Sequence, residues 1–259
     1  MRRILTLTLA GLLLTLAAPA GAAESKVKTT DITFKSGDEE IKGFLAEPEG
    51  NGPFPAIVVI QEWWGLADWI KDNAKRLAAQ GYVTLAPDLY RGKVAEDMQT
   101  ASALRKGMPH DRAMRDLKGA VDTLAAKGNV NKERIGSIGW CMGGGYSLQL
   151  AVNDNRIKAC AMCYGAVITD ADMLKPLNAT VLGIFGKEDR GIPPAQVEKF
   201  EAALKNAGKN IEAIKEFDAG HGFMRPDNPG GRNPIYRETD ARQAWQDIDK
   251  FFAKTLQGK

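Results

Sequence analysis

The chain has 259 residues, 44% hydrophobic and 26% charged, which is the composition of an ordinary globular protein with a substantial core. Its formal net charge is +3, and without Arg2 and Arg3 the balance is 33 basic against 32 acidic residues. A chain so close to neutral offers no electrostatic basis for binding nucleic acid.

The N-terminal segment has the parts of a secretory signal peptide. Two arginines precede an apolar run that ends near Ala18, and Ala20-Gly21-Ala22 form a cleavage pattern. The run is too short for a stable membrane span, and no cysteine follows it for lipid attachment. We therefore expect residues 1–22 to be removed and residues 23–259 to form one domain, exported to the periplasm or secreted, with no stable membrane anchor.

The mature chain alternates strand and helix patterns in a regular order. After a hairpin over 31–50, the expected strands are residues 56–60, 82–87, 134–138, 159–165, 180–185 and 210–217. The expected helices are residues 69–80, 111–127 and 144–152, one beginning near Pro194, and 238–255. Apolar strands separated by helices predict an α/β fold with a mostly parallel central sheet and helices on both faces. In such sheets ligands bind beyond the carboxyl ends of the strands. The sequence leaves open whether the site has a lid, for which residues 91–109 would be the place.

The sequence GWCMGG, residues 139–144, follows the expected strand at 134–138 and precedes a helix. Glycines on either side of one reactive residue are typical of a nucleophile elbow, where larger neighbours would clash. The central residue is Cys141, whose thiolate the helix N-terminus would stabilise. The backbone N–H of Met142 would then be placed to stabilise an oxyanion.

An acid and a histidine follow this elbow at the ends of two later strands. Asp189 lies 48 residues after Cys141, and His221 lies a further 32 residues on. The order nucleophile, acid, histidine is that of α/β-hydrolases. The only other histidine is His110, in a polar segment, so His221 is the candidate general base and Asp189 the acid that orients it.

The other two cysteines, Cys160 and Cys163, form a C-x-x-C pattern that could instead indicate redox chemistry. A redox motif of this kind starts a helix, whereas these two residues fall in an expected strand. Residues three apart in a strand point to opposite faces, so we interpret both thiols as buried apolar side chains. A redox or binding protein that uses Cys160 and Cys163 remains the alternative from another functional class.

At this point the chain resembles the dienelactone hydrolase family, which includes the carboxymethylenebutenolidases. The segments that carry the resemblance occur in family order, and they are QEWWGL, APDLYRG, GWCMGGG, CYG, GIFGKEDRGIPP and AGHGFMR. The resemblance implies an α/β-hydrolase fold from about residue 30 to the end of the chain. It also implies a Cys141–His221–Asp189 triad that cleaves a small lactone or ester through an acyl-enzyme intermediate.

The resemblance assigns further residues around this triad. Glu62 matches a glutamate that helps to deprotonate the cysteine, and its burial beside tryptophans should raise its pKa. The backbone N–H of Trp63 matches the second oxyanion donor, and Arg225 matches an arginine that binds a substrate carboxylate. Arg91 is the candidate for a second arginine, one residue away from the expected position. The phenol rings of Tyr90 and Tyr164 are expected to line the pocket, although core packing would explain them equally well.

These observations predict a hydrolase of carboxylic esters that needs no cofactor and holds no metal, with a small molecule as its partner. No histidines and cysteines have the spacing of a metal site, and the glycine-rich segment lacks the lysine of a phosphate-binding loop. A general carboxylesterase or thioesterase on the same fold is the second enzymatic hypothesis. The natural substrate and the oligomeric state are left open by the sequence.

Overall fold

The computed structural model describes residues 26–229 and 231–259. The expected signal peptide, residues 1–22, lies outside these ranges. Among the helices within them, none combines the length and apolar content needed to cross a membrane.

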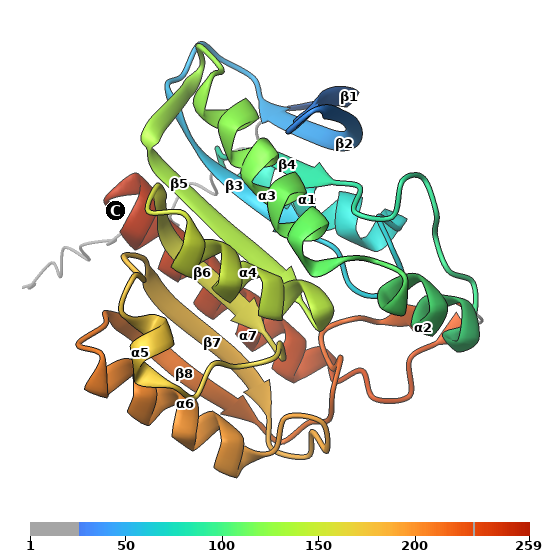
Figure 1. The fold of residues 1–259 in the computed structure, drawn as a ribbon, viewed down its shortest axis with the longest axis vertical. Helices are drawn as coiled ribbons and strands as arrows, with labels where there is room; N and C mark the ends of the chain where they lie inside the picture. Colours follow the sequence, from blue (N-terminus) through green and yellow to red (C-terminus); the bar gives the residue numbers. More distant parts are fainter. Residues whose placement is uncertain (1–25, 230) are drawn as a thin grey trace, which may run out of the picture.

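The described chain is built around an eight-stranded sheet, which runs through the centre of the molecule (Figure 1). The strands are β1 (Val27–Ser36), β2 (Glu39–Pro48), β3 (Phe54–Ile60), β4 (Val83–Pro87), β5 (Val130–Trp140), β6 (Ile157–Cys163), β7 (Thr180–Gly186) and β8 (Ile211–Phe217). Across the sheet they lie in the order β1-β2-β4-β3-β5-β6-β7-β8. The hairpin β1–β2 is antiparallel and joins β4 in antiparallel fashion, whereas β4, β3, β5, β6, β7 and β8 are all parallel. The predicted mostly parallel sheet is therefore confirmed.

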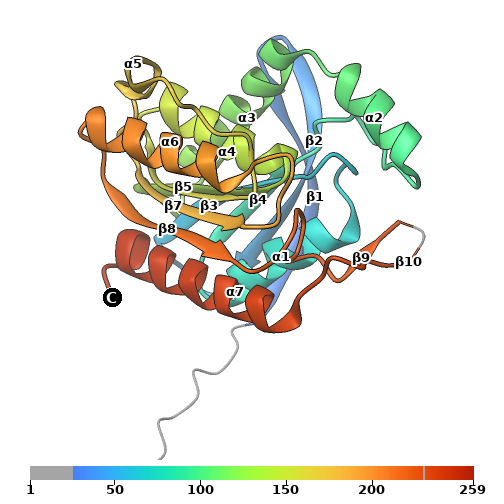
Figure 2. The same cartoon turned by 90° about the horizontal axis from the view of Figure 1, so that it is seen from below.

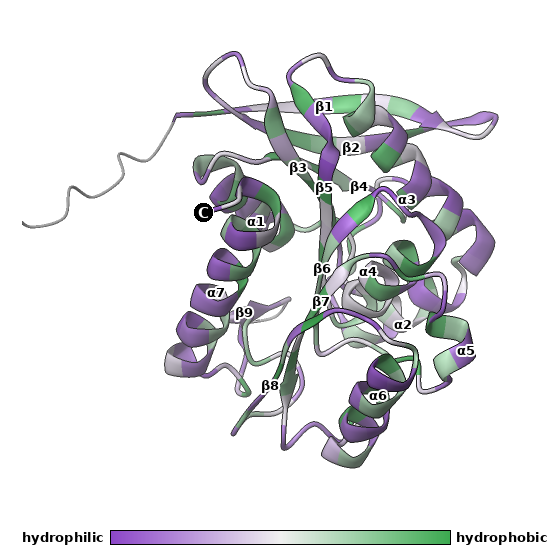
Figure 3. Cartoon of the chain, turned by 90° about the vertical axis from the view of Figure 1, so that its left-hand side faces the viewer, coloured by the Kyte–Doolittle hydropathy of each residue, from purple (hydrophilic) through white to green (hydrophobic). Residues whose placement is uncertain are grey.

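Helices cover both faces of this sheet, as Figures 2 and 3 show. The helices are α1 (Asp68–Ala79), α2 (Met98–Lys106), α3 (His110–Ala125), α4 (Met142–Asn153), α5 (Ala171–Leu174), α6 (Pro194–Asn206) and α7 (Glu238–Phe252), which continues into a π-helical turn, Ala253–Gln257. Helices α1 and α7 lie on one face, and α3, α4 and α6 lie on the other. This arrangement confirms the predicted α/β architecture with two covered faces.

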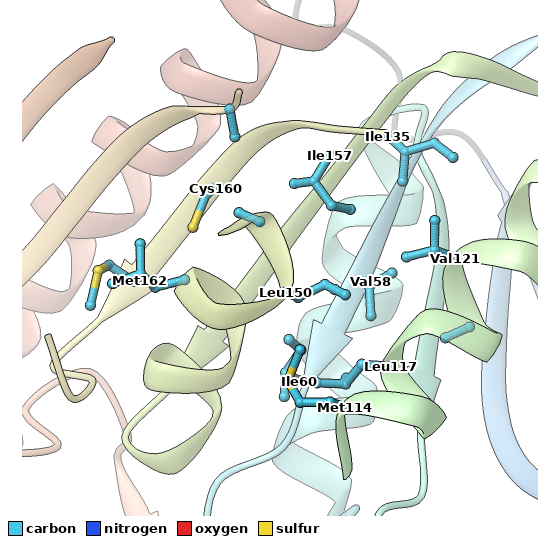
Figure 4. Close-up of a cluster of buried hydrophobic side chains, with 14 of the residues drawn as sticks. Val58, Ile60, Met114, Leu117, Val121, Ile135, Leu150, Ile157, Cys160 and Met162 are labelled. Atoms are coloured by element: carbon cyan, nitrogen blue, oxygen red, sulfur yellow. The ribbon is translucent and has the colours of Figure 1, made fainter. Parts of the chain in front are cut away.

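The alternating side chains of β3 show why its sequence is apolar throughout. Ile57 and Val59 pack among the residues of α1 and α7, whereas Val58 and Ile60 pack against α3 and α4. Figure 4 shows Val58 and Ile60 close to Leu117 of α3. All four β3 side chains are fully buried, and each such burial contributes about 1.5–3 kcal/mol to folding.

The register of the parallel strands aligns their carboxyl ends at one edge of the sheet. Ile60 at the end of β3 pairs with Gly139 of β5, and Gly186 at the end of β7 pairs with Phe217 at the end of β8. The residues that follow these strands therefore emerge side by side, which is where the sequence predicts the site.

Three short elements were not predicted from the sequence. Helix α2 lies within residues 91–109, the stretch named above as the place for a lid, and packs through Ala101 against Trp64 and Ala95. The other two are α5 and a small hairpin of β9 (Asp227–Asn228) and β10 (Gly231–Arg232). All three lie outside the central sheet, so they do not change the fold.

Candidate active site

The turn between β5 and α4 holds Cys141 in a strained conformation. Its backbone has φ 55° and ψ −118°, a region that residues other than glycine rarely adopt. A Cβ atom on Gly139 would lie 2.1 Å from the carbonyl oxygen of Gly143, and a Cβ on Gly143 would lie 2.4 Å from the carbonyl oxygen of Ile60. The flanking glycines are therefore a steric requirement of this turn, as expected for a nucleophile elbow.

Cys141 is half-buried at the N-terminus of α4, and its backbone N–H donates to the carbonyl of Cys163 (3.0 Å). The twelve-residue helix α4 directs its N-terminal dipole at this position, which favours the negatively charged thiolate. The N–H of Met142, the first residue of α4, belongs to the helix turn that has no acceptor within the helix. Gly143 packs against the carbonyls of Ile60 and Gln61, so the loop that carries Trp63 lies alongside the elbow.

The other two cysteines lie in β6 on opposite faces of the sheet, and all three cysteines are free thiols. Cys160 packs on the α3–α4 side and Cys163 on the α1–α7 side, which confirms the prediction from their spacing. Burial raises the pKa of the Cys160 thiol to about 11 and raises that of Cys163 well above its ordinary value. Two buried, protonated thiols that point apart cannot form a dithiol redox pair.

The structure brings Asp189 and His221 into direct contact. Asp189 follows β7, is 3% exposed, and accepts a 2.7 Å hydrogen bond at Oδ2 from Nδ1 of His221. Its other oxygen accepts from the backbone N–H groups of Gly191 (2.8 Å) and Ile192 (3.1 Å). Burial raises the pKa of Asp189, but His221 and these two N–H groups outweigh that effect and hold the pKa below its ordinary value. Asp189 is therefore a fixed carboxylate that orients the imidazole ring.

His221 also interacts with Cys141, so the three residues form a chain of contacts. Burial lowers the pKa of His221, but the hydrogen bonds to Asp189 and Cys141 and the charges of both partners raise it to about 10. Because Nδ1 is occupied by Asp189, Nε2 is the ring nitrogen left for the interaction with Cys141. This arrangement favours a protonated His221 imidazolium at neutral pH.

Glu62 and Arg225 form a buried ion pair in the same region. Oε2 of Glu62 accepts from Nη1 of Arg225 at 2.5 Å, and the two side chains are only 4% and 7% exposed. The guanidinium group also stacks over Trp69 (5.4 Å) and Trp64 (5.9 Å). Burial raises the pKa of Glu62, and the opposing effect of Arg225 is smaller, so the direction expected from the sequence is confirmed. The guanidinium of Arg225, which was expected to bind substrate, is engaged by Glu62.

The two tyrosines lie beside this group, whereas Arg91 does not. Tyr90 Oη donates a hydrogen bond to Sδ of Met142 (3.3 Å), next to the nucleophile. The buried ring of Tyr164 packs edge-on against His221 at 5.3 Å. Arg91, however, directs its guanidinium to Asp116 and Glu39.

The expectation that Arg91 binds substrate is not supported by its contacts. Its Nη1 lies 2.6 Å from the buried carboxylate of Asp116, and its Nη2 lies 3.0 Å from Glu39. These bonds tie the loop after β4 to α3 and to the β1–β2 hairpin. Arg91 lies one residue away from the position expected for a substrate-binding arginine, and in the structure it holds the loop after β4 in place instead.

The structure adds two residues that the sequence did not single out. Gln61 Oε1 accepts from the backbone N–H of Leu89 (3.1 Å) and so joins the loops after β3 and β4. Trp69 covers the guanidinium of Arg225 from α1. Gln61 lies within the QEWWGL segment, but nothing in the sequence indicates which distant backbone group it binds. Within residues 26–229 and 231–259, no three His, Cys, Asp or Glu side chains gather as a metal site would require.

Comparison with known proteins agrees with this fold. The model of the dienelactone hydrolase family matches residues 41–256. A Methylorubrum extorquens protein that is provisionally named a carboxymethylenebutenolidase is 33% identical over 229 residues, which cover 83% of this chain and 77% of that protein. A Salmonella typhimurium protein with the same provisional name is 30% identical over 92% of this chain and 94% of its own length. The crystal structure of a provisionally named dienelactone hydrolase from Klebsiella pneumoniae superposes with a TM-score of 0.78 at 28% identity, covering 88% of this chain and 99% of that chain.

The buried ion pair predicts a large effect of removing Arg225. Arg225→Ala leaves the Glu62 carboxylate buried without its partner, so we expect the free energy of unfolding to fall by about 3–5 kcal/mol. Activity should fall equally on neutral and on negatively charged esters, because the variant disturbs Glu62. Denaturant unfolding and kinetics on both kinds of ester measure these effects. Lys254→Ala, which breaks an exposed pair with Glu212, is the matched control and should change stability far less. An equally small loss in Arg225→Ala would contradict the ion pair.

The raised pKa of His221 predicts a specific dependence of stability on pH. The folded protein holds this proton up to a pKa of about 10, whereas the unfolded chain has the ordinary value of 6.5. The stabilising contribution is therefore complete below pH 6.5 and is lost as the pH rises towards 10.

We expect the stability difference between the natural protein and His221→Gln to shrink over that range of pH. NMR titration gives the pKa directly, because His110 and His221 are the only two histidines in the chain. Cys141→Ala should lower the pKa of His221. A His221 pKa near 6.5 in the natural protein would contradict the contacts with Asp189 and Cys141.

Proposed function

Because the chain belongs to the dienelactone hydrolase family and is a hydrolase acting on ester bonds, we propose that it cleaves small lactones or esters with Cys141 as the nucleophile. The observation that carries the proposal is the chain of contacts from Asp189 through His221 to Cys141. A nucleophile, a base and an orienting carboxylate in this relation are what acyl transfer requires.

The first half of the reaction forms an acyl-enzyme. The thiolate of Cys141 attacks the substrate carbonyl carbon, and the resulting oxyanion is stabilised by the N–H groups of Met142 and Trp63. The tetrahedral intermediate collapses when the bond from the carbonyl carbon to the ester oxygen breaks. Nε2 of His221 donates its proton to the departing oxygen, so the leaving group departs as a neutral alcohol or as the opened hydroxyl of a lactone.

The second half releases the acid. Nε2 of His221, now neutral, accepts a proton from a water molecule that attacks the thioester carbonyl. The carbon–sulfur bond then breaks, which regenerates the thiolate beside the imidazolium and releases the carboxylic acid. Asp189 keeps the ring in the tautomer that these steps need, because it accepts the Nδ1 hydrogen throughout.

We further propose that Glu62 accepts the thiol proton when Cys141 is not ionised, as the resemblance to the family implies. Its pKa, raised by burial, suits a carboxylate to this task. Arg225 occupies Oε2, and no described residue forms a hydrogen bond with Oε1. The second oxygen is thus available to the thiol, while Arg225 positions the carboxylate.

Neither arginine expected to recognise the substrate is free to do so. Arg225 is paired with Glu62, and Arg91 is paired with Asp116 and Glu39. These pairings favour the second hypothesis, a general carboxylesterase or thioesterase, over recognition of an anionic group by these two residues. The chemistry at Cys141 is the same in both cases.

Replacement of the nucleophile tests the proposal. Cys141→Ala should lower kcat/KM by at least about a thousandfold on any ester that the natural protein cleaves, because no other group can form the acyl intermediate. Its folded structure should persist, since the half-buried thiol contributes little to the core. Cys160→Ala removes a thiol from the core instead and should retain activity. Substantial esterase activity in Cys141→Ala would refute the assignment.

Oxidation provides an independent test of the charge on Cys141. We propose that the protein acts outside the cytoplasm, where the thiolate of the half-buried Cys141 would react with hydrogen peroxide to give sulfenic acid and hydroxide. Peroxide should therefore inactivate the enzyme, and a thiol reductant should restore activity at early times. The buried Cys160 and Cys163 should stay unmodified when peptides are analysed by mass spectrometry. Full resistance to peroxide would indicate that Cys141 rests as a neutral thiol.

A further inference from the structure

His221 and Arg225 lie on one short loop, between β8 and the β9–β10 hairpin. The loop places these two side chains in different ion pairs, His221 with Asp189 and Arg225 with Glu62. It is not part of the central sheet, so other contacts must fix its conformation. The segment between β10 and α7, residues 233–237, supplies several of these contacts (Figure 2).

Asn233 binds this loop through both its side chain and its backbone. Its Nδ2 donates hydrogen bonds to the carbonyl of Gly222 (3.0 Å) and to that of Arg225 (2.9 Å). Its backbone N–H donates to the carbonyl of Pro226 (2.8 Å). The residue is only 4% exposed, so water competes little for these hydrogen bonds.

The partners of the Asn233 side chain require a carboxamide at this position. Oδ1 accepts from the backbone N–H of Ile235 (3.1 Å), while Nδ2 donates to two carbonyls. One acceptor and two donors are what an asparagine side chain offers, whereas an ionised aspartate of the same shape has no donor. Pro234 follows and restricts the backbone of Asn233 to extended conformations. The amide is therefore held in one orientation against the loop.

Contacts with the same segment flank His221 on both sides. Gly222 follows the histidine, has φ 80°, and accepts the hydrogen bond from Asn233. Gly220 precedes the histidine, and a Cβ atom there would lie 2.9 Å from Cγ2 of Ile235. The backbone of His221 is thus packed from both sides, while its imidazole ring extends into the site.

The two carbonyls that Asn233 binds belong to a single turn. The N–H of Arg225 donates to the carbonyl of Gly222 (3.1 Å), so Asn233 is bonded to both ends of the turn. A displacement of the turn would move His221 at one end and Arg225 at the other. Both ion pairs around Cys141 therefore depend on the same carboxamide.

We propose that Asn233 is a positioning residue that holds His221 and Arg225 in the geometry of their ion pairs. It acts through the backbone of the turn, and it lies outside the AGHGFMR segment that carries the family resemblance. Acyl transfer is sensitive to such positioning, since a displacement of about 1 Å can lower a rate about a hundredfold. The inference rests on the proposed function, in which His221 transfers the protons.

Two substitutions of Asn233 test this role. Asn233→Ala removes the side-chain bonds to the turn, and Asn233→Asp keeps the shape but places an oxygen against both carbonyls. In each variant kcat on an ester should fall about tenfold to a hundredfold, with KM changed less than about twofold. By NMR titration the pKa of His221 should fall from about 10 towards 6.5, because the ring contacts Asp189 and Cys141 less closely.

Both variants should fold, because the segment that carries Asn233 lies outside the central sheet. Asn233→Asp gives the same two measurements if Asn233→Ala does not fold. The matched control is Asn129→Ala. Nδ2 of Asn129 also donates a hydrogen bond, to Glu47 (2.9 Å), but Asn129 precedes β5, at the opposite end of that strand from Cys141. The control should change neither kcat nor the pKa of His221.

Reduced stability of the Asn233 variants, with kcat and the pKa of His221 unchanged, would mean that Asn233 only stabilises this part of the surface. A change confined to KM would mean that Asn233 contacts the substrate. Either result overturns the inference. If the natural protein cleaves no ester, the proposed function fails, and the pKa of His221 in the Asn233 variants still decides whether Asn233 positions the histidine.

Discussion

The site depends on a steric constraint at the end of β5, where the backbone of Cys141 is held at φ 55°. Such a conformation costs about 1–3 kcal/mol and persists only where neighbouring structure enforces it. Here Gly139 and Gly143 allow α4 to pack directly on the backbone of the loop after β3, and the N–H of Cys141 is fixed by Cys163. The same close packing places the thiol at the helix N-terminus and beside the loop that carries Glu62. The packing of the buried sheet against α4 thus holds Cys141 in its strained conformation.

Two ion pairs lie in the site around Cys141, and they differ in their exposure to solvent. The Asp189–His221 pair is partly open to solvent, with the histidine side chain 40% exposed, so the imidazole can exchange protons with substrate and water. The Glu62–Arg225 pair is almost fully enclosed beneath tryptophans. Such an enclosed pair adds little net stability compared with an apolar core, but loss of either partner is costly. It therefore fixes the position of the Glu62 carboxylate in the loop that packs beside the elbow.

A structural feature can be predicted from the sequence when neighbouring residues determine it, and is hard to predict when it depends on residues far away in the chain. Apolar strands buried on both faces and residues at strand ends were predicted well, because the parallel sheet brings strand ends together whatever their separation along the chain. The direction of a long guanidinium group depends on distant partners, so the contacts of Arg91 with Glu39 and of Arg225 with Glu62 could not be predicted. Helix α2 was missed because Ala101 is its only buried residue, which leaves almost no periodic pattern.

The central claim is that Cys141 carries the acyl group during turnover. Acid quenching within the first turnover of a slow phenyl ester, followed by peptide mass spectrometry, measures this directly. The peptide that contains Cys141 should gain the mass of the acyl group, and the peptides that contain Cys160 and Cys163 should not. An acyl group on any other residue, or continued turnover after Cys141 has been blocked by alkylation, would contradict the assignment of the nucleophile.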